Sequence, residues 1–101
     1  MTSKERNPTL PDVPTVIESG IKGFEVVSFY GFLAPAGLPK DITAKLSDAF
    51  KQIMNSPDIK TRMVTQGADP AFLGSDEFAQ FLSLEMPRWA DVVKKSGAKL
   101  D

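Results

Sequence analysis

Three stretches of the chain repeat apolar residues at the spacing of an amphipathic helix. The first follows Pro39, a proline placed for the first turn of a helix. The second starts at Ser56-Pro57, a capping residue followed by a first-turn proline, and stops before Gly67. The third opens on Ser75 with two acids and closes on two lysines before Gly97, the charge order that the helix dipole favours. The pattern predicts helices over 39–55, 56–66 and 75–96.

The segment 24–34 has a different pattern. From Val26 its residues are apolar almost without a break, and only Ser28 and Gly31 interrupt the run before Pro35. A nearly continuous apolar run of this length is typical of a strand that is buried on both faces. The sequence therefore predicts a strand over 24–34, with a second, very short strand possible in the connection after Gly67.

The first 23 residues are rich in proline, with three prolines spaced three apart from Pro8 to Pro14. Proline fixes φ, removes a donor and holds the preceding residue extended, so a loop is expected. A short turn is predicted over 15–19, where Thr15 and Glu18 have the spacing of a capping box and Gly20 follows. The prediction divides the chain into 1–23 and 24–101.

Composition excludes several classes of function. The 101 residues include 12 basic and 13 acidic ones, for a net charge of -1, without a basic stripe, so no nucleic-acid partner is expected. There is no cysteine and no histidine. The chain therefore lacks the commonest general base and the commonest metal ligands. No apolar run reaches membrane-spanning length, and the first residues lack the apolar core of a signal peptide, so no export signal is expected.

Catalysis is not predicted. The carboxylates are explained as helix-cap, turn or solvated residues, and general acid–base chemistry needs an apolar pocket that raises a pKa. We expect no enzyme, no catalytic residue, no metal site and no cofactor.

Two groups of residues are candidates for ligand contact. In Phe29, Tyr30 and Gly31, a glycine beside two aromatics could let a ligand or another backbone approach closely, although core packing explains them too. Trp89 beside Arg88 could form a stacking platform, or Trp89 could anchor the core through its place on the apolar stripe of the third helix.

A single strand cannot satisfy its own ladder hydrogen bonds. The sheet to which 24–34 belongs must therefore be completed from elsewhere. Either a second copy of the chain supplies the strands, or the chain is part of a larger α/β protein.

The order of landmarks along the chain resembles one known family, the substrate-binding receptors of tripartite tricarboxylate transporters, also called Bug receptors. The resemblance covers about Thr2 to Leu100 and rests on the following segments: Leu10-Pro11-Asp12-Val13-Pro14-Thr15, Glu18-Ser19-Gly20, Gly23-Phe24-Glu25-Val26, Tyr30-Gly31, Leu33-Ala34-Pro35-Ala36-Gly37, Pro57-Asp58, Gly67-Ala68, Arg88-Trp89, Val92-Val93-Lys94 and Gly97. Two positions depart from the family pattern: Phe29 stands where tryptophan is common, and Pro87 stands where a regular helix usually continues.

The resemblance implies a fold and a function. The chain would be the C-terminal part of a type II periplasmic-binding-protein lobe, an α/β fold, with 1–23 just beyond the hinge and 24–101 forming a partial lobe. The intact receptor would bind small tricarboxylates or dicarboxylates in the periplasm and deliver them to a membrane permease. Phe29, Tyr30 and Gly31 would lie near the hinge and the cleft floor. The isolated chain is expected to bind no ligand and to self-associate. The alternative is a stand-alone, mostly helical interaction domain that forms a homodimer.

Overall fold

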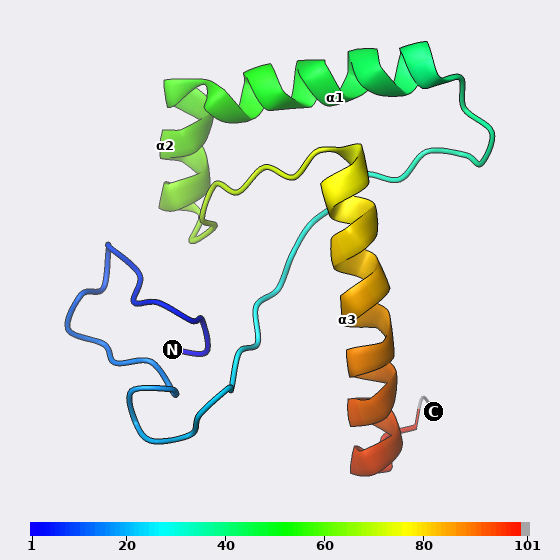
Figure 1. Cartoon of the computed structure of the whole chain (residues 1–101). Coiled ribbons are helices and arrows are strands. Elements are labelled where there is room, and N and C mark those ends of the chain that lie inside the picture. The colour runs from blue at the N-terminus through cyan, green and yellow to red at the C-terminus, as the bar shows by residue number, and fades with distance from the viewer. Residues whose placement is uncertain (100–101) are drawn as a thin grey trace. The chain divides into compact units, whose positions relative to one another are not determined.

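The computed structural model describes residues 1–99 and divides into two compact units, Met1–Ala34 and the part from Pro35 onward. The described residues contain three helices, all in the second unit: α1 (Lys40–Asn55), α2 (Pro57–Thr65) and α3 (Ser75–Ser96) (Figure 1). The three helices predicted from the sequence are confirmed, with ends that differ by at most one residue. No strand occurs within residues 1–99.

Prolines and glycines set the helix ends. Pro39 is the N-cap of α1 and not a first-turn residue, whereas Pro57 does occupy the first turn of α2. Ser56 separates the two helices and donates its N–H to the Ile53 carbonyl at 3.0 Å. At the end of α2, Gly67 adopts a φ of +76°. There Ala68 N–H bonds the Met63 carbonyl at 2.9 Å, and Gly67 N–H bonds the Val64 carbonyl at 3.0 Å, the two bonds of a Schellman motif.

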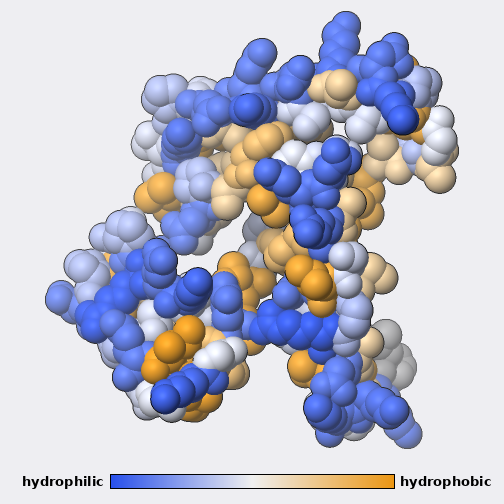
Figure 2. All heavy atoms as spheres, viewed as in Figure 1, coloured by the Kyte–Doolittle hydropathy of each residue, from blue (hydrophilic) through white to orange (hydrophobic). Residues whose placement is uncertain are grey.

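In the second unit, α1 contacts both α2 and α3. Several large apolar residues of this unit are partly buried: Phe50, Met54, Ile59, Met63, Phe72, Phe78, Phe81 and Leu82. Phe78 and Phe81 stack on successive turns of α3, with ring centroids 6.1 Å apart. No apolar side chain among residues 1–99 is fully buried. Figure 2 accordingly shows apolar surface open to solvent between stretches of charged surface.

The apolar stripe of α3 continues beyond its half-buried end. Met86 is 69% exposed and Val93 is 50% exposed, although both follow Leu82 at helical spacing. The helix is unbroken across Pro87. Because this part of the stripe is largely exposed, the helical part of the chain presents apolar surface that further polypeptide could cover.

The first unit is organised by the predicted turn at 15–19. Thr15 N–H donates to Glu18 Oε2 at 2.8 Å, and Glu18 N–H donates to Thr15 Oγ1 at 3.1 Å, so the capping box is present. Gly20, with φ of +104°, ends the turn, and Ile21 N–H reaches back to the Val16 carbonyl at 3.3 Å. Thr15 is 1% exposed, the most buried side chain that the structure describes. The turn prediction is confirmed.

The predicted strand over 24–34 is wrong for the chain by itself. These residues carry neither helix nor strand, and their side chains face solvent rather than lying buried on both faces. Phe32 is 78% exposed and Leu33 is 82% exposed. The physical reason is that a strand needs a ladder partner, and the described residues supply none. The possible short strand after Gly67 is absent as well.

Glu85, Arg88 and Trp89 form a cluster of polar contacts on α3. Glu85 Oε1 accepts a hydrogen bond from Arg88 Nη1 at 2.9 Å, and its Oε2 accepts one from Trp89 Nε1 at 2.9 Å. The Arg88 guanidinium lies 5.8 Å from the centre of the Trp89 ring. The Arg88 hydrogen bond lowers the pKa of Glu85 most; partial burial opposes it, and the Trp89 N–H adds to the lowering.

Among residues 1–99, none of the helices combines the length and the apolar content needed to cross a bilayer.

Substitution Gly67→Ala is expected to destabilise the second unit. An alanine Cβ would meet no atom within 4 Å, so the cost is the positive φ and not a clash. The left-handed conformation costs about 1–2 kcal/mol for a residue with a Cβ. Urea unfolding followed by circular dichroism at 222 nm should show a lower midpoint. The control is Gly67→Asn, whose urea midpoint should fall less, because asparagine tolerates the left-handed conformation. Equal midpoints for the wild type and Gly67→Ala would contradict the expectation.

Trp89 is the single tryptophan of the chain and should report the protonation of Glu85. Because the pKa of Glu85 is lowered from 4.5, its stabilising contribution is present above that value and is lost as pH falls through the lower folded pKa. Tryptophan emission against pH should therefore show a midpoint below 4.5. In Arg88→Gln the midpoint should move up towards the ordinary value. In Lys94→Gln, which removes a charge from the same helix, it should stay in place; equal movement in both variants would refute the assignment.

Candidate functional site

The predicted ligand-binding residues lie on the open segment of the first unit. Tyr30 is 90% exposed and Phe29 is 45% exposed. Gly31 follows them on the same extended stretch, without secondary structure. The phenol of Tyr30 is thus available to solvent, but nothing within the described part of the unit encloses a ligand around it. The role of these three residues stays a prediction.

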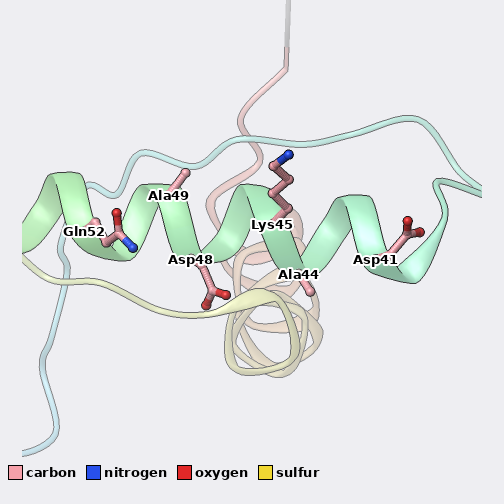
Figure 3. Close-up of a pocket in the computed structure, with 6 residues that line it drawn as sticks. All are labelled: Asp41, Ala44, Lys45, Asp48, Ala49 and Gln52. Carbon is pink, nitrogen blue, oxygen red and sulfur yellow. The ribbon is translucent and has the colours of Figure 1, made fainter.

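The second unit has a shallow hollow on the outer face of α1. Its lining residues all come from this one helix: Asp41, Ala44, Lys45, Asp48, Ala49 and Gln52. Figure 3 shows Lys45 and Ala49 on one side of the helix and Ala44 and Asp48 on the other. A surface built by a single helix cannot remove most of a small molecule from water, whereas ligand pockets usually bury most of their ligand. This hollow is therefore no binding pocket.

A second hollow lies between α1 and the start of α3. Lys40, Ser47 and Lys51 line it from α1, and Ser75, Asp76 and Glu77 line it from α3, with Phe72 and Gly74 beside them. The lysines would attract a carboxylate, but the acids of α3 oppose it. Glu77 Oε2 also accepts the Gly74 N–H at 3.3 Å, so the chain's own carboxylate already uses this helix end. The hollow does not form an anion site.

The remaining candidates show no catalytic chemistry. The pKa values of Glu18 and Glu85 are lowered, and a general acid that works near neutral pH needs a raised one. No group of three or more potential ligands within residues 1–99 could hold a metal ion. Trp89 is 37% exposed, so it is not a buried core anchor, and Arg88 already lies over its ring. A free stacking platform is therefore not present there.

Sequence reasoning missed one constellation in the first unit. Arg6 Nε donates to both carboxylate oxygens of Glu18, at 3.1 and 2.9 Å, across a separation of twelve residues. Val26 N–H donates to the Thr2 carbonyl at 2.9 Å. The capping spacing identified Glu18, but no local pattern points to Arg6 or to Thr2, because both contacts depend on how the loop returns.

Comparison with known proteins identifies the family. The model of the family described as "Tripartite tricarboxylate transporter family receptor" matches residues 1–98. Protein BugT of Bordetella pertussis is 32% identical over 98 residues, covering 97% of this chain and 30% of BugT. The protein from the TAR-I ttuE-ttuC' intergenic region of Agrobacterium vitis is 35% identical over 100 residues, covering 96% and 29%. The protein from the tcbD-tcbE intergenic region of Pseudomonas sp. strain P51 is 31% identical over 94 residues, covering 92% and 28%.

These matches confirm the family resemblance that the sequence landmarks indicated. They also show how much of a family member this chain represents. The chain spans less than a third of the length of these relatives. No solved structure matches the chain. The family is one of transport receptors, which confirms the expectation of a non-enzymatic protein. The alternative of a stand-alone helical homodimer has no support in the comparisons. On the match across residues 1–98, the chain belongs to the family of tripartite tricarboxylate transporter receptors.

Proposed function

We propose that the chain forms part of a solute-binding lobe in a receptor that binds small tricarboxylates or dicarboxylates. The receptor acts in the periplasm, and a membrane permease of the tripartite transporter is its partner. The observation that carries this proposal is the family match over residues 1–98. The lack of any buried apolar side chain among residues 1–99 supports it, because a lobe of a receptor three times as long would cover these faces.

In the receptor the lobe is α/β, and residues 24–34 form one of its strands. The segment is already extended and apolar on both faces. It contains no proline, so every residue from Phe24 to Ala34 carries the N–H that a strand ladder requires, although that of Val26 already bonds the Thr2 carbonyl. Residues 1–23 lead from the hinge, and residues 24–101 belong to the lobe. The strand would then form on docking, when ladder partners become available.

The ligand contacts proposed for this chain are Phe29, Tyr30 and Gly31, near the hinge and the cleft floor. The Tyr30 hydroxyl can donate to a carboxylate, and Gly31 allows its backbone to approach closely. Hinge closure of two lobes would bury the ligand, with backbone N–H groups and bridging water holding the carboxylate. One lobe fragment supplies only part of that enclosure.

The isolated chain should bind no carboxylate, whereas a complete receptor built with it should. Calorimetry with citrate, malate and an amino-dicarboxylate should show no binding to the isolated chain. A chimera of BugT, in which this chain replaces the matching segment, should bind at least one of them. In the chimera, Tyr30→Phe should weaken binding about five- to tenfold, the usual effect of one lost hydrogen bond.

Thr65→Val is the matched control for that substitution, since it removes a hydroxyl from α2, in the other unit. Its affinity should equal that of the unmodified chimera. Micromolar binding by the isolated chain, or a folded chimera that binds none of the three classes, would overturn the proposal.

We also propose that the chain in isolation associates with further copies of itself, most simply as a symmetric dimer. Apolar side chains are exposed on all three helices and on 24–34, and contiguous apolar patches of this kind are rarely left bare by a stable monomer. Light scattering should give a mass of about twice the 11.0 kDa of one chain. A mass of one chain, together with a cooperative melt, would exclude self-association.

A further inference from the structure

The first two residues lie between the turn at 15–19 and the start of the segment 24–34. The Met1 carbonyl accepts the N–H of Val16 at 2.9 Å, and the Met1 backbone nitrogen donates to the Pro14 carbonyl at 2.6 Å. The next carbonyl, that of Thr2, accepts the N–H of Val26 at 2.9 Å. Contacts that hold Met1 and Thr2 in place therefore also hold Val26, and with it the start of the segment 24–34, close to the turn.

Arg6 ties the other end of this N-terminal segment to the same turn. Its Nε contacts both oxygens of Glu18, and its Nη1 donates to the Pro11 carbonyl at 2.8 Å. Glu18 in turn accepts the Thr15 N–H. One carboxylate thus joins the N-terminal segment to the capping box. Such charge-assisted contacts fix geometry well because the guanidinium donates in set directions.

The ion pair between Arg6 and Glu18 contributes little to stability through its own energy. The Arg6 and Glu18 side chains are 44% and 46% exposed, so water screens their attraction, and pairs of this kind contribute little to stability. Its geometry is more informative, because it joins two residues twelve positions apart and so closes a loop that contains the buried Thr15. Arg6 also holds the pKa of Glu18 below its usual 4.5, so the carboxylate that Arg6 contacts is charged at neutral pH.

We propose that Arg6 and Glu18 are positioning residues, a clasp that holds residues 1–6 against the turn and thereby sets the position of Val26 at the start of 24–34. The proposed ligand-contact residues, Phe29 to Gly31, follow within five residues of Val26. The clasp therefore helps to set the position of this segment. Its importance for ligand binding rests on the proposed function; the clasp itself does not.

Amide hydrogen exchange on the full chain tests the clasp without any ligand. Two amides serve as reporters: Val26, bonded to Thr2, and Ser19, bonded to the Thr15 carbonyl at 3.1 Å inside the turn. In Arg6→Gln the capping box keeps both its partners, whereas the N-terminal segment loses the contact of Arg6 with Glu18 and keeps those of Met1. Protection of the Val26 amide should fall about tenfold, and that of Ser19 should change by less than about threefold.

Lys4→Gln is the matched control, because it removes the same charge from the same segment two residues earlier. It should leave both amides at wild-type protection. Arg6→Lys should give an intermediate loss at Val26, since it keeps the charge but not the planar fork.

Unchanged protection of Val26 in Arg6→Gln would overturn the proposal. Equal loss in Lys4→Gln would overturn it as well, because the effect would then be one of net charge. Equal loss at Ser19 and Val26 would show that Arg6 merely stabilises the turn. These results are separate from carboxylate binding by the BugT chimera: a working clasp in a chimera that binds nothing would leave the clasp standing and the proposed function refuted.

Discussion

Burial of apolar surface is the constraint on which the rest of this structure depends. The chain is 42% hydrophobic, near the globular average, yet no apolar side chain within residues 1–99 is fully buried. Hydrophobic burial is the main favourable term in folding. Local devices therefore define the shape of each unit: helix caps, the Thr15–Glu18 capping box, glycine-ended turns and ion pairs. Within residues 1–99, packing of apolar side chains adds only partial burial to these devices.

The two units meet this constraint in different ways. In the second unit, α1 touches α2 and α3 and half-buries a group of aromatic and aliphatic residues, so the helices have some tertiary support. The first unit has no helix and depends on polar contacts around Thr15. Its apolar segment 24–34 gains almost nothing from those contacts. That contrast explains why the helical predictions hold in the chain alone and the strand prediction does not.

The family match is consistent with the exposed apolar surface of this chain. The relatives are more than three times as long as the stretch they share with this chain, so they contain further polypeptide that could cover the exposed faces. Fold and family alone do not name the ligand, since one fold can hold many different sites.

The sequence by itself determined the elements whose signals are local. Helix periodicity, Pro57 in a first turn, Gly67 and Gly97 after helix ends and the Thr15–Glu18 capping box are each decided within a few residues, and each was found. Tertiary structure decided the rest. The contact of Arg6 with Glu18 depends on the path of a whole loop, and pairing of 24–34 depends on neighbours, because a strand's hydrogen bonds are made to other segments while a helix makes its own.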